Sequence, residues 1–187
     1  MGYKKHTNTT IITDLVSTYE AMSQSGTLAL LDEKVFLQLI DYYEQEFLLE
    51  RALEVADQGI EHHAFSAELH LRKAALLLHA RREDDALSLL DKAEALSPAD
   101  LQISLLRAEV FGHLGMHATA LEMLEILKDF AIGEELGAIY QVESIVYEQQ
   151  EQHELMFFAL KTALTYDPTN EQALERMWAC VELTKKY

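Results

Sequence analysis

The sequence predicts an all-α fold built from stacked helix pairs, and two observations support this prediction. First, small residues recur at a 34-residue interval, at Ala52, Ala86 and Ala120. The segments around them read alike: ERALEVADQGI, DDALSLLDKAEAL and ATALEMLEIL. A period of this length is typical of stacked helix–turn–helix repeats. Second, the 187 residues include only two prolines and seven glycines, whereas the good helix formers Leu, Ala, Glu, Gln and Lys dominate.

Residues 67–100 show the repeat most clearly. Their first helix is predicted by an apolar stripe at three- and four-residue spacing, which consists of Leu71, Ala74, Leu77 and Leu78. After the break at ARRED, a second helix is predicted by Ala86, Leu89, Leu90 and Ala93. Pro98 cannot continue a helix, and Asp100 is well placed to cap the next one.

This unit resembles the tetratricopeptide repeat. The positions that this family fills with small, large apolar and proline residues are occupied here by Ala74, Leu77, Ala86, Leu90, Ala93 and Pro98. The resemblance implies a right-handed α-α superhelix, a tetratricopeptide solenoid, of about four helix pairs with an extra helix at each end. In its arrangement the chain also resembles small bacterial tetratricopeptide proteins of undefined role.

The same register divides the chain into six segments. Residues 1–32 are expected to form an N-terminal helix and a connector, with Thr13 as the helix cap and Leu15, Tyr19 and Met22 on its apolar side. A solitary capping helix is expected over 171–187, with Trp178 at a small position. The four repeats between them are expected at 33–66, 67–100, 101–136 and 137–170.

Two departures from the repeat pattern stand out in the second half of the chain. Two extra residues near 130–134 shift the phase of the repeat. Met156 takes the place of the expected central alanine, which predicts a looser helix pair there.

The formal charge of −17 bears on the choice of partner. Such a surface repels phosphate backbones and anionic lipids, so we expect neither a nucleic-acid nor a membrane partner. A basic or amphipathic protein segment fits this charge better. The alternative is that the charge only keeps the protein soluble.

The sequence offers no pattern of catalytic or metal-binding residues. His113 and His117 have a spacing that chelates metals on a helix, but Gly115 between them falls at the expected turn. His62 and His63 are expected in a solvated turn, and Cys180 in the core. No zinc, nucleophile or phosphate-loop signature is present. We therefore expect no enzyme activity, no metal and no cofactor. With no secretory signal or membrane-length apolar run, a cytoplasmic location is expected.

In this family, peptides lie along the concave surface formed by the first helix of each repeat. The resemblance places there Leu37, Asp41, Leu71, Ala75, Leu78, His79, Leu105, Glu109, His113, Gln141, Ile145 and Glu148. Leu37, Leu71 and Leu105 would form a row at the repeat interval. The rim is expected to be acidic, with Lys34 its only base and with Asp41, Glu44, Glu68, Glu109, Glu148, Glu175 and Glu182 as its acids.

The function expected from these features is that of a non-catalytic scaffold or adaptor that holds a protein segment in the groove. The lysines and asparagines with which one subset of the family grips a peptide carboxylate are missing, because Leu37, Asp41 and Leu105 occupy such positions. Three alternatives remain. The leucines pack between helices, the N-terminal helix fills the groove with Ile12, Leu15 and Tyr19, or the protein is a structural subunit of a homo-oligomer whose groove is self-occupied.

Overall fold

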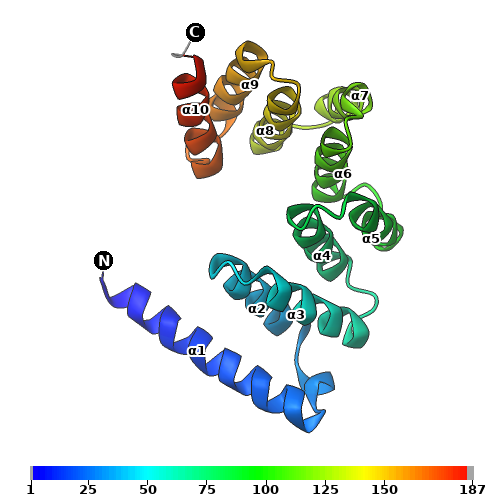
Figure 1. The fold of residues 1–187 in the computed structure, drawn as a ribbon, viewed down its shortest axis with the longest axis vertical. Coiled ribbons are helices and arrows are strands. Elements are labelled where there is room, and N and C mark those ends of the chain that lie inside the picture. The colour runs from blue at the N-terminus through cyan, green and yellow to red at the C-terminus, as the bar shows by residue number, and fades with distance from the viewer. Residues whose placement is uncertain (1, 185–187) are drawn as a thin grey trace. The chain divides into compact units, whose positions relative to one another are not determined.

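The structure is a computed structural model that describes the backbone of residues 2–184. It describes the side chains of residues 12–182 except 13 and 29. Over the described backbone the chain forms ten α-helices and one short 3-10 helix, with no β-strand (Figure 1). The chain divides into two compact units, Met1–Pro98 and Ala99–Tyr187, which we call unit 1 and unit 2. None of the described helices is long and apolar enough to cross a membrane.

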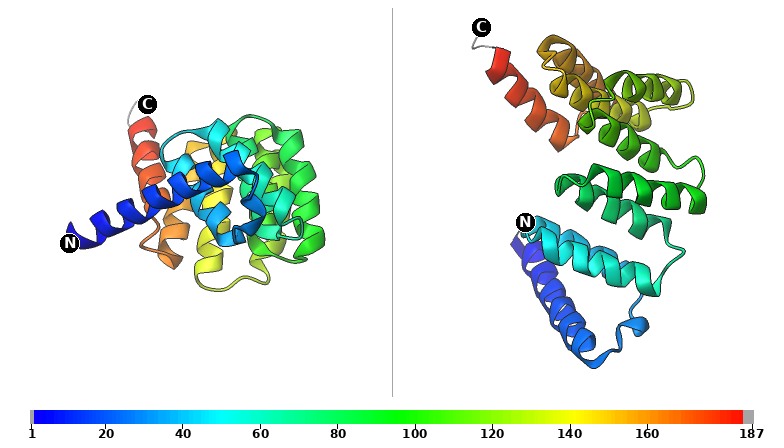
Figure 2. Two further views of the ribbon diagram at one scale, coloured as in Figure 1. Left: turned by 90° about the horizontal axis from the view of Figure 1, so that it is seen from below. Right: turned by 45° about the vertical axis from the view of Figure 1, so that its right-hand side comes forward.

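Unit 1 consists of a long first helix followed by two helix pairs. The elements are α1 (Gly2–Ser25), η1 (Leu28–Leu30), α2 (Glu33–Gln45), α3 (Leu49–His62), α4 (Ala67–His79) and α5 (Glu83–Leu96). Helices α2 and α3 pack as one pair, α4 and α5 as the next, and α3 also packs against α4 (Figure 2). Close packing requires a small residue at Gly59, where an added Cβ would lie 3.2 Å from the Phe36 Cβ and from the Leu69 Cδ2.

Unit 2 repeats this arrangement and adds one helix. Its elements are α6 (Leu101–His113), α7 (His117–Lys128), α8 (Glu134–Gln149), α9 (His153–Tyr166) and α10 (Glu171–Thr184). The pairs are α6–α7 and α8–α9, with α6 packed on α8 and α10 packed on α9. The Asp100 side chain caps α6 by accepting a hydrogen bond from the Gln102 backbone N–H at 2.9 Å, which confirms the predicted cap.

The backbone of the turn inside each pair marks the repeat directly. Phe47, Arg81, Gly115 and Glu151 all have a positive φ, of 58°, 59°, 76° and 58°. They follow one another at intervals of 34, 34 and 36 residues, so the longer last interval contains the two extra residues predicted from the sequence. We propose that α2–α3, α4–α5, α6–α7 and α8–α9 are the four repeats.

Three details differ from the sequence expectations. Helix α1 begins at Gly2, so Thr13 lies inside the helix and does not cap it. Helix α8 begins at Glu134, so residues 134–136 belong to the fourth pair, since Gly133 (φ 56°) supplies the left-handed turn before it. A looser helix pair was predicted at Met156. Instead, Met156 is fully buried in a core with Leu160, Ala173 and Cys180, because its flexible side chain fills the space between α9 and α10.

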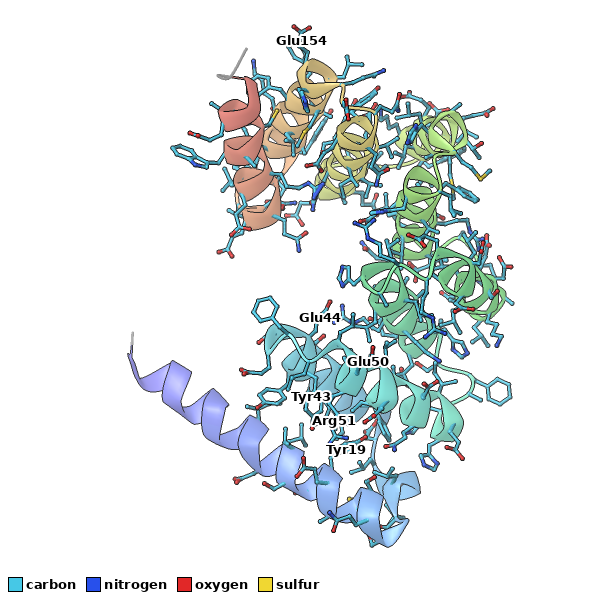
Figure 3. All side chains as sticks on the ribbon, viewed as in Figure 1. Tyr19, Tyr43, Glu44, Glu50, Arg51 and Glu154 are labelled. Atoms are coloured by element: carbon cyan, nitrogen blue, oxygen red, sulfur yellow. The ribbon has the colours of Figure 1, made fainter. Side chains whose placement is uncertain are left out.

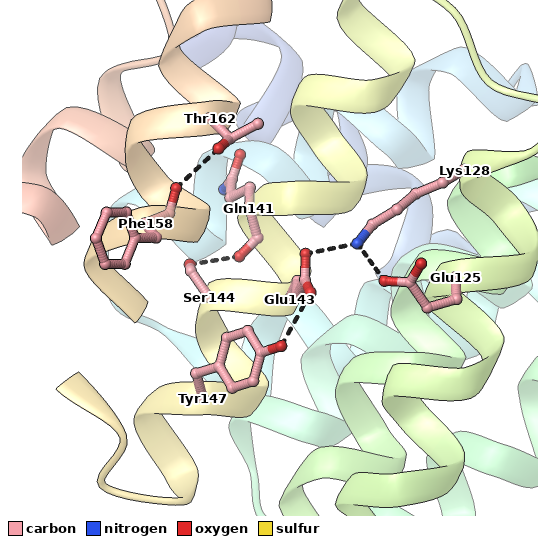
Figure 4. A network of polar contacts seen from close by, with 8 residues as sticks. All are labelled: Glu125, Lys128, Gln141, Glu143, Ser144, Tyr147, Phe158 and Thr162. Carbon is pink, nitrogen blue, oxygen red and sulfur yellow. Dashed lines mark hydrogen bonds and ion pairs between the residues drawn. The ribbon is translucent and has the colours of Figure 1, made fainter. Parts of the chain in front are cut away.

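A buried ionic network joins α7 to α8 (Figure 4). The Lys128 Nζ donates hydrogen bonds to Glu125 Oε1 at 2.6 Å and to Glu143 Oε2 at 2.9 Å. The Tyr147 hydroxyl donates to the other Glu143 oxygen at 3.1 Å. Glu143 is only 7% exposed. Burial alone would lower the pKa of Lys128, but the hydrogen bonds that it donates to both carboxylates, together with their negative charges, raise it overall, so this lysine stays charged inside the fold.

Candidate functional site

In unit 1 the first helices of the two pairs lie next to each other and share an accessible face. On α2 this face carries Leu37, Asp41 and Glu44, which the helical spacing places on one side of the helix. On α4 the corresponding positions are Leu71, Ala75 and Leu78. Leu37, Leu71 and Ala75 are half-buried, whereas Leu78 is only 3% exposed and belongs to the core.

An ion-paired cluster runs across this face. Arg72 of α4 donates hydrogen bonds to Asp41 and, at 3.2 Å, to the Glu44 Oε2. The His79 Nδ1 lies 3.4 Å from the Glu44 Oε1. The hydrogen bond from His79 and the charge of Arg72 together lower the pKa of Glu44 (labelled in Figure 3), although burial opposes them. The α2–α4 face is defined here as Leu37, Asp41, Glu44, Leu71, Arg72, Ala75 and His79.

The predicted positions in unit 2 are less accessible. Leu105 is 4% exposed and lies in a core with Ala108, Leu124 and Ile139, while Ile145 is 9% exposed. The structure therefore buries Leu105 where it leaves Leu71 half-buried at the same register.

The polar candidates of unit 2 are held by neighbouring helices. Gln141 donates a hydrogen bond to Gln172 and accepts one from Asn170, at 2.8 and 2.6 Å. Glu148 pairs with Arg176 of α10. Glu109 and His113, on α6, are half-buried.

The expectation that Lys34 is the only base of the rim is wrong. Arg72 neutralises Asp41 and Glu44 in unit 1, and Arg176 neutralises Glu148 in unit 2. The two arginines occupy the same position of the repeat, one residue after the positions of Leu71 and Glu175. That shared register was a signal in the sequence that could have identified them.

The histidines do not converge on a metal site. His113 ends α6 and His117 begins α7, with Gly115 in the turn between them, so the two do not share a helix. His63 follows the end of α3 and is partly buried, with its Nε2 2.9 Å from the Leu31 carbonyl oxygen. Across the residues that the structure describes, no three His, Cys, Asp or Glu side chains are placed to hold one metal ion.

Tyr19 of α1 does not fill the α2–α4 face. Its hydroxyl donates a hydrogen bond to Gln58 Oε1 of α3 at 2.6 Å, and its side chain lies near Tyr43 and Arg51 (Figure 3). Burial, followed by the nearby Tyr43, raises the pKa of Tyr19 to about 12. The described part of α1 packs mainly against α2, and the Tyr19 side chain reaches α3 rather than the α2–α4 face.

Solved structures of tetratricopeptide-repeat proteins share this fold. TTC0263, a thermophilic protein of this kind from Thermus thermophilus, superposes with a TM-score of 0.68 over 96% of this chain and 95% of that chain, at 16% identity. MamA superposes with a TM-score of 0.63 over 92% and 97%, at 19% identity. YrrB, described as having an unusual peptide-binding site, superposes with a TM-score of 0.60 over 91% and 85%, at 15% identity.

Sequence comparison adds one distant relative. The human protein O-mannosyl-transferase TMTC1 is 27% identical over 130 residues, which make up 68% of this chain. The matched segment spans only 13% of that relative. No family model matches the chain.

Proposed function

Since the chain has the tetratricopeptide-repeat fold, we propose that it is a non-catalytic protein-interaction module that binds a protein segment on the first helices of its repeats. The observation that supports this proposal is the α2–α4 face, where half-buried leucines lie beside an exposed ionic cluster. The peptide-binding site described for YrrB, which shares the fold, supports it further.

The chemistry of the face suggests the kind of segment that it binds. Leu37 and Leu71 offer apolar surface whose burial drives association, at about 25 cal/mol per Å². Asp41 remains half exposed despite its pair with Arg72, so a basic side chain of the partner can compete for it. A segment with apolar residues flanked by Lys or Arg, either helical or extended, satisfies both features.

The predicted positions of unit 2 support the proposal less strongly, because they offer polar contacts but little apolar surface. Glu109, His113, Gln141 and Glu148 offer polar contacts on α6 and α8, whereas Leu105 lies in the core that α6 forms with α7 and α8, and Ile145 is buried as well. We therefore assign the apolar part of recognition to unit 1.

The experiment is a comparison of captured partners between two double variants. Leu37→Gln/Leu71→Gln removes the apolar part of the α2–α4 face without changing a charge. The matched control is Leu48→Gln/Leu96→Gln, which changes two exposed leucines of unit 1 outside the face. We expect to find a protein that wild type and control retain equally and that the face variant loses. The binding segment of that protein, tested in isolation, should bind wild type and control with equal affinity and the face variant more weakly.

Two results would contradict the proposal. Equal capture by all three proteins would place recognition elsewhere. A sedimenting mass at a multiple of 21.3 kDa that only the face variant reduces to the monomer would show that a second copy occupies the face.

A further inference from the structure

Helix α10 has one covered side and one exposed apolar side. Its inner side carries Ala173 and Cys180, both fully buried against Met156 and Leu160 of α9. Its outer side carries Leu174 and Trp178, which are 48% and 73% exposed. An indole that is three-quarters exposed in the middle of a helix leaves a large apolar surface in water.

The repeat register explains what this outer side corresponds to. Trp178 takes the position held by Ser144 in α8 and Ala108 in α6, and both of those are fully buried. Ala108 shares its core with Ala120 and Leu124 of α7, the second helix of its pair. On α10 the side that a second helix covers in the other pairs is exposed, as Leu174 and Trp178 show.

The size of Trp178 constrains what can cover it. Ala108 and Ser144 are small because paired helices approach to about 8–10 Å. An indole at this position holds a covering helix further away or requires small residues opposite it. The surface therefore differs in shape from the surfaces that α7 and α9 cover.

The charge around Trp178 constrains the partner as well. Glu171, Glu175 and Glu182 are exposed and lie on the same side of α10 as Trp178, at spacings of seven, three and four residues. A second copy would bring this acidic row against its own equivalent, which is unfavourable in a protein of net charge −17. We propose that the outer side of α10 docks a basic amphipathic helix from another protein, with small apolar residues facing Trp178 and Lys or Arg facing the three glutamates.

This surface is separate from the α2–α4 face and is tested separately. Trp178 is the only tryptophan in the chain, so its fluorescence reports on this site alone. The probes are two synthetic helical peptides with one Ala/Leu stripe, flanked by Lys in the first and by Glu in the second. We expect the Lys-flanked peptide to shift Trp178 emission to shorter wavelengths and to bind more weakly as salt rises.

The variants separate apolar docking from general attraction to an acidic protein. Leu174→Gln/Trp178→Gln keeps every charge, and we expect it to weaken binding of the fluorescein-labelled Lys-flanked peptide about tenfold or more, as loss of a central aromatic contact does. The matched control is Leu155→Gln/Phe158→Gln, an exposed apolar pair on α9, which we expect to bind as wild type does. Glu171→Gln/Glu175→Gln is expected to reduce both the affinity and its dependence on salt.

Three results would overturn the proposal. Equal binding of the Glu-flanked peptide would remove the charge argument. Unchanged binding by Leu174→Gln/Trp178→Gln, checked by circular dichroism to be folded, would show that the peptide is held by net charge alone. Concentration-dependent self-association that this variant abolishes would make a second copy the occupant of the surface.

Discussion

The two units carry nearly the same repeats but expose different chemistry. In the described part of unit 1, the exposed large apolar side chains lie in turns, in η1 or at a helix end: Leu30, Phe47, Leu48, Phe65 and Leu96. Unit 2 also exposes apolar side chains inside its helices, at Ile126, Leu155, Phe158, Leu174 and Trp178. Among the described residues, exposed large apolar side chains therefore lie in the interior of helices only in unit 2, whereas Leu37 and Leu71 on the helices of unit 1 are half-buried.

The ion pairs of the two units differ in exposure: those of unit 1 are accessible, whereas the Lys128–Glu143 pair of unit 2 is buried. The Arg72 cluster of unit 1 lies at an accessible face, with Asp41 about half exposed. The Lys128 network of unit 2 is buried, with Glu143 side-chain exposure of 9%. Charges at the surface are available to a ligand, whereas charges in the core hold two helices together. The same repeat pattern thus places one ion-paired cluster at an accessible face and another between two packed helices.

The largest change in stability is expected from breaking the buried Lys128–Glu143 pair, which tests the contrast between buried and exposed ion pairs. Glu143→Leu leaves Lys128 buried with Glu125 as its remaining carboxylate partner, and we expect it to lower the free energy of unfolding by about 3 kcal/mol. The comparison is Glu54→Gln, which breaks the exposed pair with Arg51 and should cost far less, because solvent screens surface ion pairs. Urea unfolding measures both. Similar losses would show that the buried network contributes no more than a surface ion pair.

A smaller effect is expected at one turn position that the two units fill differently. Phe47 has φ 58°, which is unfavourable for a bulky residue, and its side chain is 93% exposed. We expect Phe47→Gly to raise the free energy of unfolding by about 1 kcal/mol, because glycine adopts this φ without strain. At the equivalent Gly115, φ is 76° and an added Cβ meets nothing within 4 Å. Gly115→Ala should therefore lower the free energy of unfolding by about 1 kcal/mol through backbone strain alone.

The sign of the Phe47→Gly effect shows whether this exposed phenylalanine contributes to stability. If Phe47→Gly stabilises the protein, as expected, the phenylalanine does not contribute to the stability of the fold. A destabilised Phe47→Gly variant would instead show that the phenylalanine stabilises the fold despite its exposure.

The sequence was sufficient for the fold because the fold is periodic. The alanines at the 34-residue interval fix the register of each helix pair, and the left-handed turn residues Phe47, Arg81, Gly115 and Glu151 follow that register. Helix α1 lies outside the repeats, so nothing periodic marked its start at Gly2. The fourth repeat was expected to begin at residue 137, whereas α8 begins at Glu134, directly after the turn at Gly133.

The candidate site was less predictable because it depends on neighbours of a given helix. Leu71 and Leu105 share a register, yet Leu105 is buried in the core that α6 forms with α7 and α8. Arg72 pairs with residues 31 and 28 positions earlier, a contact that exists only once α4 lies beside α2. Register identifies equivalent positions, but packing decides which of them stay exposed.

The smallest expected effect concerns the acid stability of the α2–α4 face. The pKa of Glu44 is lowered in the folded protein by its hydrogen bond from His79 and by Arg72, with Asp41 competing for the same arginine. A carboxyl group whose folded-state pKa is depressed stabilises the protein above its unfolded pKa of about 4.5, and this contribution is lost as pH falls through the folded value.

Glu44→Gln should therefore lower the free energy of unfolding at neutral pH and reduce the further loss of stability on acidification. Urea unfolding at about pH 7 and about pH 3.5 measures the free energy of unfolding at neutral pH and its loss on acidification. The control is Glu61→Gln, an exposed change on α3, which should leave the acid dependence as in wild type. If Glu44→Gln loses as much stability on acidification as wild type does, the acid dependence arises outside the α2–α4 face.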